Sequence, residues 1–436
     1  MDLSLSDRKI LLVSYHFPPS VEVGGRRPSG LKKYLERRGW EVHVVTEDPA
    51  KYPPGSVPAA ANISRHDGGG GTNGPLRKAM RSLKASIPGK SRIRETLNLL
   101  LDVPDAHVGW ALRAIMEARR RLKQERIPIV YTTAPPHSAN LVGLVLKRLD
   151  PGLLWVCEFR DLWTSDVGYR YKDNPFRRRA DAYIERELLT RADRIVTVTE
   201  AFLRILLERY KADMQVVYNG FDRDFYPALT ARERNEVFRV LYCGSLYTGE
   251  RDPQPFLSAL EDCVVRGDIH PDRIRVEFFV QRYDRDSLEK AKRTMRYPQI
   301  LVIRDTVPYE KIARIQGEVE CHLVINRNHQ CEIGPIPAKI YEFIATGLPI
   351  LVWDPANSMK EDLCYLGRYR GLSIHTGPGS LKTALVDLYR AWLEGGNTVH
   401  TASDDFSQEI MAGKVEAILE ELLEKRRCFL RETTGR

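Results

Sequence analysis

The sequence predicts an α/β protein with two doubly wound parallel sheets that follow one another along the chain. Short apolar segments alternate with helical patterns through most of the 436 residues, which is typical of parallel sheets covered by helices. The alternation stops at the polar segment 223–236 and then begins again. A chain of this length is also long for a single hydrophobic core.

The elements of the first half are expected in a regular order. Apolar segments predict strands, and apolar residues at helical spacing predict the helices between them. The strands are expected at 9–15, 41–46, 129–133, 153–159 and 194–199, and the helices near 29–38, 107–126, 137–149 and 176–191. A last short strand and turn are expected at 215–222.

The second half repeats the pattern, with strands expected at 238–245, 275–280, 300–305, 321–327, 348–353 and 372–376. We therefore expect a Rossmann-like domain at 1–222, a linker at 223–236 and a second Rossmann-like domain at 237–400. A helical tail at 401–436 is expected to pack back towards the first domain. The carboxyl ends of the strands should face a cleft between the domains, where such folds bind ligands.

The composition suits a soluble protein. Hydrophobic residues make up 43% of the chain and charged residues 29%, and no stretch of about 18 uncharged apolar residues predicts a transmembrane helix. The polar N-terminal segment is not expected to be a signal peptide. The seven cysteines are scattered without metal-binding spacing, so we expect free thiols in a reducing cytoplasm and no metal site.

Positive charge is concentrated in the first half. Residues 1–215 contain 37 Lys and Arg against 25 Asp and Glu, a net charge of +12, whereas the whole chain has +9. The rest of the chain therefore carries −3. A basic domain can face a nucleic acid, an anionic membrane or a phosphorylated ligand. Nucleic acid is the least favoured, because no aromatic-basic platform or recognition motif is present.

A glycine pair, Gly24 and Gly25, follows the first expected strand and precedes a helix. The loop does not contain G-x-G-x-x-G, so it does not fit the dinucleotide fingerprint. Glycines here allow a positive φ and a close backbone approach. Their N–H groups, with the following helix N-terminus, can face a phosphate or a sugar. A plain tight turn would use glycines as well.

Seven segments, in the same order, resemble glycosyltransferase family 4, and particularly its bacterial cell-surface polysaccharide enzymes. The resemblance runs from residue 9 to about 355. It is carried by HFPPSVEVGGRRPSGLKKYLERRGWEVHVVT from His16, YTTAPPHSANLVGLVLKR from Tyr131, FRDLW from Phe159, RADRIVTVTEAF from Arg191, VYNGFD from Val217, LYCGSLYTGERDP from Leu241 and IPAKIYEFIATGLPILV from Ile336.

The resemblance implies the GT-B fold, in which two Rossmann-like domains bind a nucleotide-sugar donor between them. It also implies a retaining, metal-independent transfer of a sugar to a saccharide or lipid-linked acceptor in cell-surface polysaccharide biosynthesis. The donor is expected to be UDP- or GDP-linked, with no cofactor beside it.

The resemblance places donor-binding residues in the second domain. Glu342 matches the later of two family glutamates and implies a ribose contact, since a carboxylate can accept from both hydroxyls of a diol. Gly334 replaces the earlier glutamate, and Glu332 could substitute for it if the loop reshapes. Main-chain N–H groups near Gly334 could still hold the sugar. Lys339 shares a helical face with Glu342, although a solvated surface lysine would fit there equally.

Phosphate contacts are expected after the first strand of the second domain, which ends at Gly244. The family often has an arginine directly after this glycine and a lysine six residues later. Ser245 and Arg251 occupy these positions. Arg251 can bind a diphosphate in a bidentate way, whereas Ser245 gives one weaker hydrogen bond. Arg327 could supply the missing charge or could be an ordinary surface residue.

The first domain is expected to hold the acceptor and the catalytic residues His137 and Asp161. His137 starts a helix after a strand, where cleft residues lie, and can bind a hydroxyl or assist proton movement. It could instead cap the helix. Asp161 could orient a substrate hydroxyl or pair with Arg160. Glu158 is expected to be structural, and no Ser-His-Asp arrangement predicts a covalent nucleophile.

The segment from Leu76 to Ile87 predicts a basic amphipathic helix. Its apolar residues repeat at helical spacing, and the stripe is flanked by the expected membrane-facing residues Arg77, Lys78, Arg81 and Lys84. Such a helix can lie on an anionic membrane, so we expect a cytoplasmic protein that is peripheral on the inner face of the membrane. A helix that packs its stripe on the domain would look the same.

Two other functions stay open. A GT-B sugar-nucleotide 2-epimerase would share the fold and the donor without an acceptor. A non-catalytic nucleotide-sugar-binding homologue is also compatible, because Gly334 and Ser245 stand where the family often has charged residues.

Overall fold

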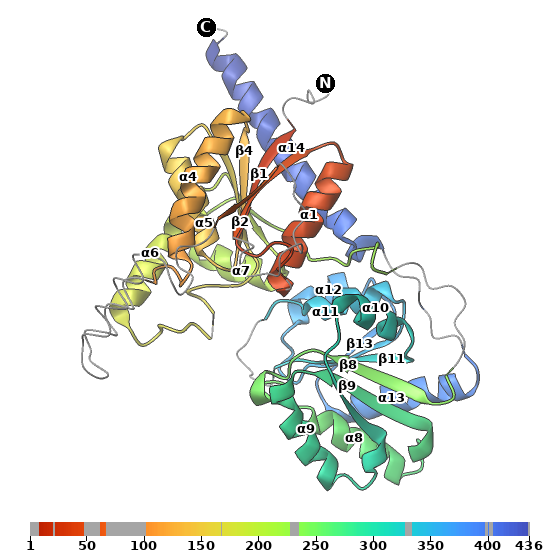
Figure 1. Ribbon diagram of the computed structural model, residues 1–436. Coiled ribbons are helices and arrows are strands. Elements are labelled where there is room, and N and C mark those ends of the chain that lie inside the picture. The colour runs from red at the N-terminus through yellow and green to blue at the C-terminus, as the bar shows by residue number, and fades with distance from the viewer. Residues whose placement is uncertain are drawn as a thin grey trace. The chain divides into compact units, whose positions relative to one another are not determined.

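The computed structural model describes residues 8–20, 22–47, 62–66, 102–166, 168–226, 235–327, 334–396, 400 and 404–434. They divide into two compact units (Figure 1). Unit 1 comprises Met1–Tyr218 and Gln408–Arg436, and unit 2 comprises Asn219–Ser407. Unit 1 is therefore built from two segments of the chain, one on each side of unit 2 in the sequence.

Unit 1 contains a seven-stranded sheet with the order β3-β2-β1-β4-β5-β6-β7. All the neighbouring strands in it pair in parallel. The strands are β1 (Lys9–Ser14), β2 (Glu41–Glu47), β3 (Ile63–His66), β4 (Ile129–Ala134), β5 (Leu154–Phe159), β6 (Arg194–Thr197) and β7 (Met214–Val216). The order reverses between β1 and β4, where a doubly wound sheet opens a crevice at its carboxyl edge.

Helices cover both faces of this sheet. They are α1 (Arg26–Arg37), α4 (Val108–Gln124), α5 (Ser138–Leu149), α6 (Pro175–Arg191), α7 (Glu200–Arg209) and α14 (Gln408–Thr434). Leu154 and Val156 of β5 pack in a core with α1 and α14. Trp155 lies between them in the strand and therefore points to the other face, where it contacts Gly143 of α5. α4 and α6 lie on either side of α5 in that second layer (Figure 1).

The long helix α14 belongs to unit 1 and runs beside α1 (Figure 1). Its apolar side completes the core, because Val415, Ile418 and Leu419 are almost fully buried. Its polar side is tied to the start of the chain. Arg8 contacts Glu420 at 2.6 Å, across 412 residues of sequence. The packing of unit 1 thus depends on a segment that follows unit 2 in the chain.

Unit 2 contains a six-stranded sheet with the order β10-β9-β8-β11-β12-β13. Its pairs are also parallel. The strands are β8 (Phe238–Cys243), β9 (Ile274–Val280), β10 (Leu301–Asp305), β11 (Cys321–Ile325), β12 (Ile350–Trp353) and β13 (Leu372–His375). The α-helices are α8 (Gln254–Val265), α9 (Arg282–Thr294), α10 (Tyr309–Gly317), α11 (Ala338–Ala345), α12 (Leu363–Leu366) and α13 (Pro378–Leu393).

The larger core of unit 2 lies under α8 and α13, where Phe238 of β8 meets Tyr389 and Trp392 edge-on. A smaller cluster with Leu241 and Phe279 lies on the other face, next to α10. Strands β8 and β11 lie beside each other at the centre of the sheet, so the loop after β8 begins at the point where the strand order reverses.

The predicted fold class is confirmed: both sheets are parallel and helices alternate with the strands. One strand was not predicted. β3 has the polar sequence ISRH, which lacks an apolar run, and it forms because it pairs with β2 from Val44 to Glu47. Among the described residues, every helix is too short or too polar to cross a membrane. The predicted basic helix with Arg77, Lys78, Arg81 and Lys84 lies outside the described residues.

Candidate functional site

The loop after β8 in unit 2 has a backbone that only a few residues tolerate. Gly244 has φ +124°, a conformation in which side chains are strained. The loop is held by Asp284 of α9, which accepts a hydrogen bond from Leu246 N at 2.8 Å and one from Ser245 Oγ at 3.0 Å. Ser245 Oγ in turn accepts from Tyr247 N. Ser245 is therefore part of a fixed turn.

Lys339, in the first turn of α11, brings an ammonium group to this loop. Its Nζ lies 4.2 Å from the ring centre of Tyr242. A Cβ added to Gly244 would lie 3.1 Å from the same nitrogen. The nitrogen is buried and has no hydrogen-bond partner. A lysine in this position does not act as a solvated surface residue.

Burial and, to a smaller extent, the charge of the neighbouring Arg251 lower the pKa of Lys339 from 10.5 to about 7. Arg251 itself donates to Ser245 O at 3.3 Å and stacks on Tyr247 at 4.7 Å, while its Nε is buried without a partner. Two adjacent cationic groups thus have unsatisfied donors. An uncompensated buried cation is costly, so the arrangement is suited to bind an anion.

The other predicted donor-binding residues lie at different distances from Lys339 and Arg251. The Arg327 guanidinium lies over the Tyr247 ring, 5.6 Å from its centre, and its Nε lies 3.1 Å from Glu250. Glu342 is nearly buried one turn after Lys339 and raises its pKa. Gly334 has open space at its Cβ position. Glu332 lies outside the described residues.

Unit 2 therefore brings Gly244, Ser245, Arg251, Lys339 and Glu342 together, with Arg327 beside them. Sequence analysis missed Tyr242 and Asp284, which support the cationic pair and the turn. Tyr242 could have been noticed as an aromatic residue two positions before the glycine. Nothing in the sequence connects Asp284 to a loop 38 residues earlier.

In unit 1, the glycine pair forms a short 3₁₀ turn, Val23–Gly25, that leads into α1. The expectation of a positive φ is wrong: Gly25 has φ −82°, and neither glycine is in the left-handed region. Gly25 N donates to Glu22 O within the turn, so this N–H is already used. The close approach does occur at Gly24, whose Cβ would lie 3.2 Å from the ring of His16.

Arg160, which sequence analysis considered only as a partner of Asp161, fixes the glycine turn. Its guanidinium donates to Gly24 O at 2.5 Å and to Pro135 O at 2.9 Å. It thereby joins the turn after β1 to the end of β4. Asp161 is half-buried, and its charge interacts with Arg160. These residues meet at the carboxyl edge of the sheet.

His137 precedes α5 but does not cap it. The cap comes from Asp105, whose carboxylate accepts from Ser138 N at 2.9 Å and from Ser138 Oγ at 2.6 Å. The His137 ring stacks on Trp163 with centres 4.5 Å apart, and its Nδ1 is buried without a partner. Burial lowers its pKa to about 4, so the imidazole is neutral at pH 7.

Glu158 is structural, as expected from its place within β5. It forms a buried ion pair with Arg27 at 2.8 Å and also accepts from Tyr131 and Thr133. Arg27 further donates to the carbonyl of Val217. Its charge lowers the pKa of Glu158 in spite of the carboxylate's burial. The pair ties α1 to β5 beneath the candidate site.

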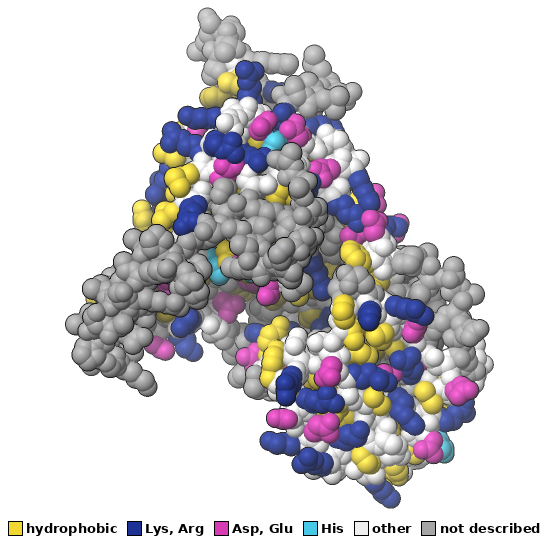
Figure 2. All heavy atoms as spheres, in the orientation of Figure 1, with side chains coloured by type: hydrophobic (Ala, Val, Ile, Leu, Met, Phe, Trp, Pro, Cys, Tyr) yellow, Lys and Arg dark blue, Asp and Glu magenta, His cyan; other side chains and the backbone are white. Residues whose placement is uncertain are grey.

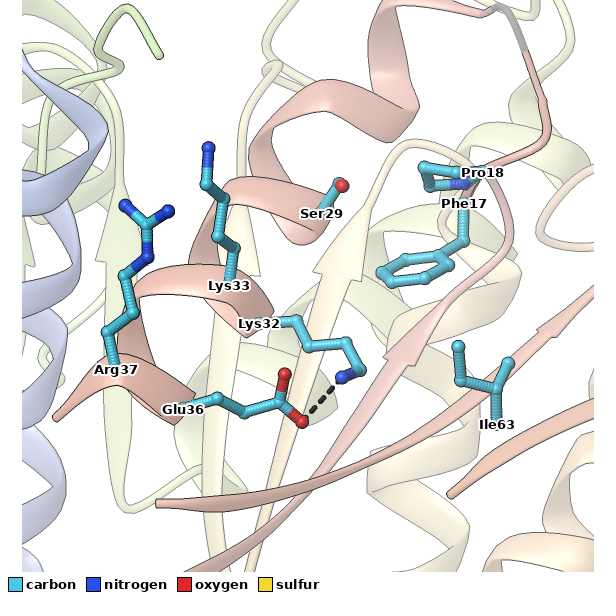
Figure 3. A pocket seen from close by; sticks show the side chains of 8 residues that line it. All are labelled: Phe17, Pro18, Ser29, Lys32, Lys33, Glu36, Arg37 and Ile63. Atoms are coloured by element: carbon cyan, nitrogen blue, oxygen red, sulfur yellow. Dashed lines mark hydrogen bonds and ion pairs between the residues drawn. The ribbon is translucent and has the colours of Figure 1, made fainter. Parts of the chain in front are cut away.

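An open pocket of about 540 Å³ lies beside the glycine turn, between α1 and β3 (Figure 3). Phe17, Pro18 and Ile63 form its apolar wall. Lys32 reaches towards this wall and pairs with Glu36 at 2.5 Å. Lys33 and Arg37 also line the pocket, so its lining keeps an excess of positive charge.

One group of side chains could hold a metal ion at the opposite edge of unit 1. Ligand atoms of Glu41, His43 and Glu125 lie within 4.8 Å of one another. Glu41 is bound by Lys9 at 3.0 Å, and His43 Nδ1 faces Arg121 at 3.3 Å. The group surrounds the first residues of β2, away from the carboxyl edge.

Comparison with known proteins bears on the fold and the family of the chain. Residues 29–225 match the model of glycosyltransferase family 4. Sucrose-phosphate synthase from Thermosynechococcus elongatus has a TM-score of 0.55 at 15% identity, over 96% of this chain and 99% of that chain. A putative UDP-N-acetylglucosamine 2-epimerase from Listeria monocytogenes gives 0.55 at 12% identity, over 96% and 97%.

A structure described as trehalose-6-phosphate from E. coli bound with UDP-2-fluoro glucose gives a TM-score of 0.54 at 12% identity, over 97% of this chain and 98% of that chain. A search of curated proteins gave no match. The chain thus has the GT-B fold and carries a glycosyltransferase family 4 domain. Fold and domain together define the class of protein, a glycosyltransferase.

Proposed function

We propose that this enzyme is a retaining glycosyltransferase that moves a sugar from a UDP- or GDP-linked donor to a saccharide or lipid-linked acceptor in cell-surface polysaccharide biosynthesis. The observation that carries the proposal is the pair of cationic groups in unit 2. Lys339 Nζ and Arg251 Nε are both buried without hydrogen-bond partners, next to Gly244, whose missing Cβ leaves room for the lysine nitrogen.

In this proposal, the donor diphosphate lies against Lys339 and Arg251, with Arg327 at the margin. An arriving phosphate gives the buried donors the charged acceptors that they lack, which makes each hydrogen bond comparatively strong. Glu342 accepts hydrogen bonds from the ribose hydroxyls. Gly334 leaves the sugar end of the donor to main-chain groups.

The reaction breaks the bond between the sugar and the diphosphate and forms a bond to an acceptor hydroxyl oxygen. The diphosphate leaves as an anion, and Lys339 and Arg251 stabilise the charge that develops on it. The acceptor loses a proton as it attacks. His137 is neutral and can receive or orient that hydroxyl proton, while Asp161 and the turn at Gly24 position the acceptor.

We assign the protein to the cytoplasm, with peripheral attachment to the inner face of the membrane. The charge of +12 in residues 1–215 supports this assignment, because anionic lipid attracts basic segments. The segment with Arg77, Lys78, Arg81 and Lys84 is proposed to lie on the lipid surface. A lipid-linked acceptor would then be presented at the same surface.

A sugar-nucleotide 2-epimerase is the second candidate, because the fold is as similar to the Listeria monocytogenes protein as to sucrose-phosphate synthase. The two functions differ in the need for an acceptor. Incubation with UDP-N-acetylglucosamine alone would yield an epimer in one case and an unchanged donor in the other. Product analysis by NMR distinguishes them.

The first test measures thermal stabilisation by UDP, GDP, dTDP and ADP, since a ligand that binds the folded state raises the unfolding temperature. We expect one of UDP or GDP to stabilise the protein. Activity is then measured with the corresponding nucleotide sugars and membrane-derived lipid acceptors. No stabilisation by any of the four at millimolar concentration would contradict the donor assignment.

A further inference from the structure

The first three turns of helix α6 in unit 1 have the reverse of the usual polarity, whereas its last turn buries Leu188 and Leu189. A surface helix normally buries its apolar side and exposes its charges. In α6 the side chains of Arg177, Asp181 and Glu185 are almost completely buried, at 3%, 0% and 0% exposure. Phe176 and Tyr183 are 82% and 61% exposed. The two aromatic side chains therefore do not contribute to the hydrophobic core of unit 1, and their position on the surface needs another explanation.

The buried charges fix the rotation of the helix. Arg177 Nε lies 2.8 Å from each carboxylate oxygen of Asp181, and its Nη2 donates to Pro104 O at 2.7 Å. Glu185 accepts from Thr164 N at 3.0 Å and from Tyr210 at 2.8 Å. A rotation that buried the aromatic residues would break these contacts and expose the partners. The outer face is thus a fixed surface.

That outer face combines aromatic and basic residues. Phe176, Arg179, Tyr183 and Arg186 follow one another at three, four and three positions, a spacing that puts them on one side of a helix. All four are exposed. Arg178, Lys172 and Arg170 are exposed beside the first turn, and Asp173 is the exposed acidic residue among the described residues from 168 to 186.

A neighbouring helix extends this surface. α4 lies in the same layer, on the other side of α5. It exposes Leu112 and Met116, at 57% and 67%, and then Arg119 and Lys123. Figure 2 shows apolar and basic side chains together on the side of unit 1 that carries α4. Two helices of one layer thus present the same combination to solvent.

We propose that the outer face of α6, together with Lys172 just before its first turn, docks unit 1 on an anionic lipid bilayer. Phe176 and Tyr183 enter the interfacial region, where aromatic side chains are favoured. The basic residues around them bind lipid phosphates and experience the negative surface potential. A protein partner of matching shape is less favoured, because the aromatic residues stand singly between arginines and do not form a groove.

The docking also has a consequence for the proposed function, on which this step rests. α6 follows β5, so its first turns lie at the carboxyl edge of the sheet, as do Gly24, His137 and Asp161. A bilayer that contacts Phe176 therefore lies on the side of unit 1 where the acceptor is proposed to bind. A lipid-linked hydroxyl group could reach that edge without leaving the membrane surface.

Liposome flotation of the full-length protein, without donor or acceptor, tests the docking. Vesicles of phosphatidylglycerol and phosphatidylcholine are compared with phosphatidylcholine alone, at low and high salt. The variants are Phe176→Gln with Tyr183→Gln, and Arg178→Gln with Arg179→Gln. The matched control is Val265→Ser with Arg314→Gln, which changes a 54% exposed apolar residue and an 85% exposed arginine of unit 2.

We expect the wild-type protein to float with the anionic vesicles, to be released by salt, and to stay unbound with phosphatidylcholine alone. Each α6 variant should lower the bound fraction at least fivefold, and the control should float as the wild type. Equal flotation of wild type and α6 variants would overturn the proposal, since the attachment would then come from another segment. Failure of the wild type to float would overturn it too.

Two further readouts separate this proposal from others. Thermal stabilisation by UDP or GDP should be the same in the α6 variants and the wild type. If stabilisation persists while flotation fails, the docking surface is wrong and the donor assignment stands. The α6 variants are also tested for retention on DNA and for concentration-dependent dimers in ultracentrifugation. If the variants lose one of these properties but float as the wild type does, the surface binds a nucleic acid or a second copy of the chain instead of lipid.

Discussion

At the scale of single residues, the most informative group is a lysine that lacks a partner. Unpaired buried charges are rare because they lower the free energy of unfolding. Lys339 is kept although Arg251, also cationic, lies beside it. Functional sites often carry such strained groups, at a cost in stability. The cost is recovered when an anionic ligand arrives.

Lys339→Met should separate the effect of this lysine on stability from its effect on diphosphate binding. The pKa of Lys339 is about 7 in the folded protein, against 10.5 for the free side chain, so the unfolded state binds more protons between pH 7 and 10.5. Its contribution to stability therefore rises with pH across that window. We expect the variant to unfold at a higher temperature than wild type near pH 7, and to bind nucleoside diphosphate at least tenfold more weakly.

Because of the same lysine, the affinity of the wild type for nucleoside diphosphate should depend on pH. Phosphate binds the ammonium form, so affinity should fall from pH 6 to pH 9, and binding at pH 8 should take up a proton. Calorimetry in buffers of different ionisation enthalpy measures that uptake. Lys290→Met, at an exposed position of α9, is the control. A pH-independent affinity in the wild type would show that Lys339 does not contact the phosphate.

His137 should contribute to kcat, but its own titration should not appear in the pH profile of kcat. Its pKa of about 4 keeps it neutral from pH 5 upwards, so kcat should show no inflection from this residue between pH 5 and 8. His137→Asn should lower kcat by about 10²-fold or more, as for loss of a proton-transferring group. His270→Asn, at a position 62% exposed in unit 2, should leave kcat unchanged. Normal kcat in His137→Asn would remove it from the catalytic group.

The glycine pair offers a matched comparison of two neighbouring positions. A methyl group on Gly24 would lie 3.2 Å from the His16 ring, whereas on Gly25 it would find ordinary contacts of 3.5 Å. We expect Gly24→Ala to displace the turn and lower kcat/KM at least tenfold, and Gly25→Ala to remain active. Both kcat/KM and the unfolding temperature are measured. Equal activity of the two variants would contradict a precise role for this turn.

At the scale of elements, helix α9 fixes the backbone of the loop that follows β8. Asp284 lies in the first turn of α9 and accepts from two groups of that loop. A carboxylate that holds one backbone N–H and one hydroxyl of the loop restricts the loop before any ligand binds. Less ordering is then needed on binding.

Asp284→Ala should therefore weaken nucleotide binding without any direct contact to the nucleotide. We expect a loss of roughly 1–3 kcal/mol in unfolding free energy, since a buried hydrogen-bonded acceptor is removed, and a weaker diphosphate affinity. Urea unfolding and calorimetry provide the two values. Asp286→Ala, at an exposed position of the same helix, is the reference. Unaltered affinity in a destabilised Asp284→Ala variant would limit this residue to a structural role.

The elements also show what the sequence could predict. Long apolar strands such as IVYTT and RVEFFV and the helices between them were expected from local pattern alone. β3 could not be, because its pairing with β2 makes it a strand in spite of its polar residues. The donor residues came from motif resemblance, but Tyr242, Asp284 and Arg160 became visible only through contacts between segments far apart in the chain. The φ of the glycine turn was predicted wrongly, since a 3₁₀ turn needs no left-handed residue.

At the scale of the whole molecule, the division into units suggests which parts are autonomous. Unit 2 is one continuous segment, Asn219–Ser407, and it contains all the described residues of the cationic site. We expect a chain of residues 219–407 to fold and to retain measurable affinity for UDP or GDP. Circular dichroism and calorimetry check both points. A folded unit 2 that binds no nucleotide would move part of the donor site elsewhere.

Unit 1 should behave differently as a fragment. Residues 1–218 alone would expose the apolar surface that α14 covers, including the environment of Leu419. We expect this fragment to aggregate, and addition of a peptide of residues 408–434 to increase its soluble yield. Sedimentation of the two preparations measures the difference. A monomeric and cooperatively unfolding 1–218 fragment would contradict the dependence on α14.

The placement of α14 also affects how the protein is made. The contact between Arg8 and Glu420 spans 412 residues, so the first strand of unit 1 leaves the ribosome long before its partner helix. At roughly 5–20 residues per second, the 412 residues that separate Arg8 from Glu420 take about 20–80 s to synthesise. During that interval unit 2 can fold, while the sheet of unit 1 waits with one apolar face uncovered. Nascent unit 1 is thus a natural client for chaperones, and its assembly follows synthesis rather than accompanying it.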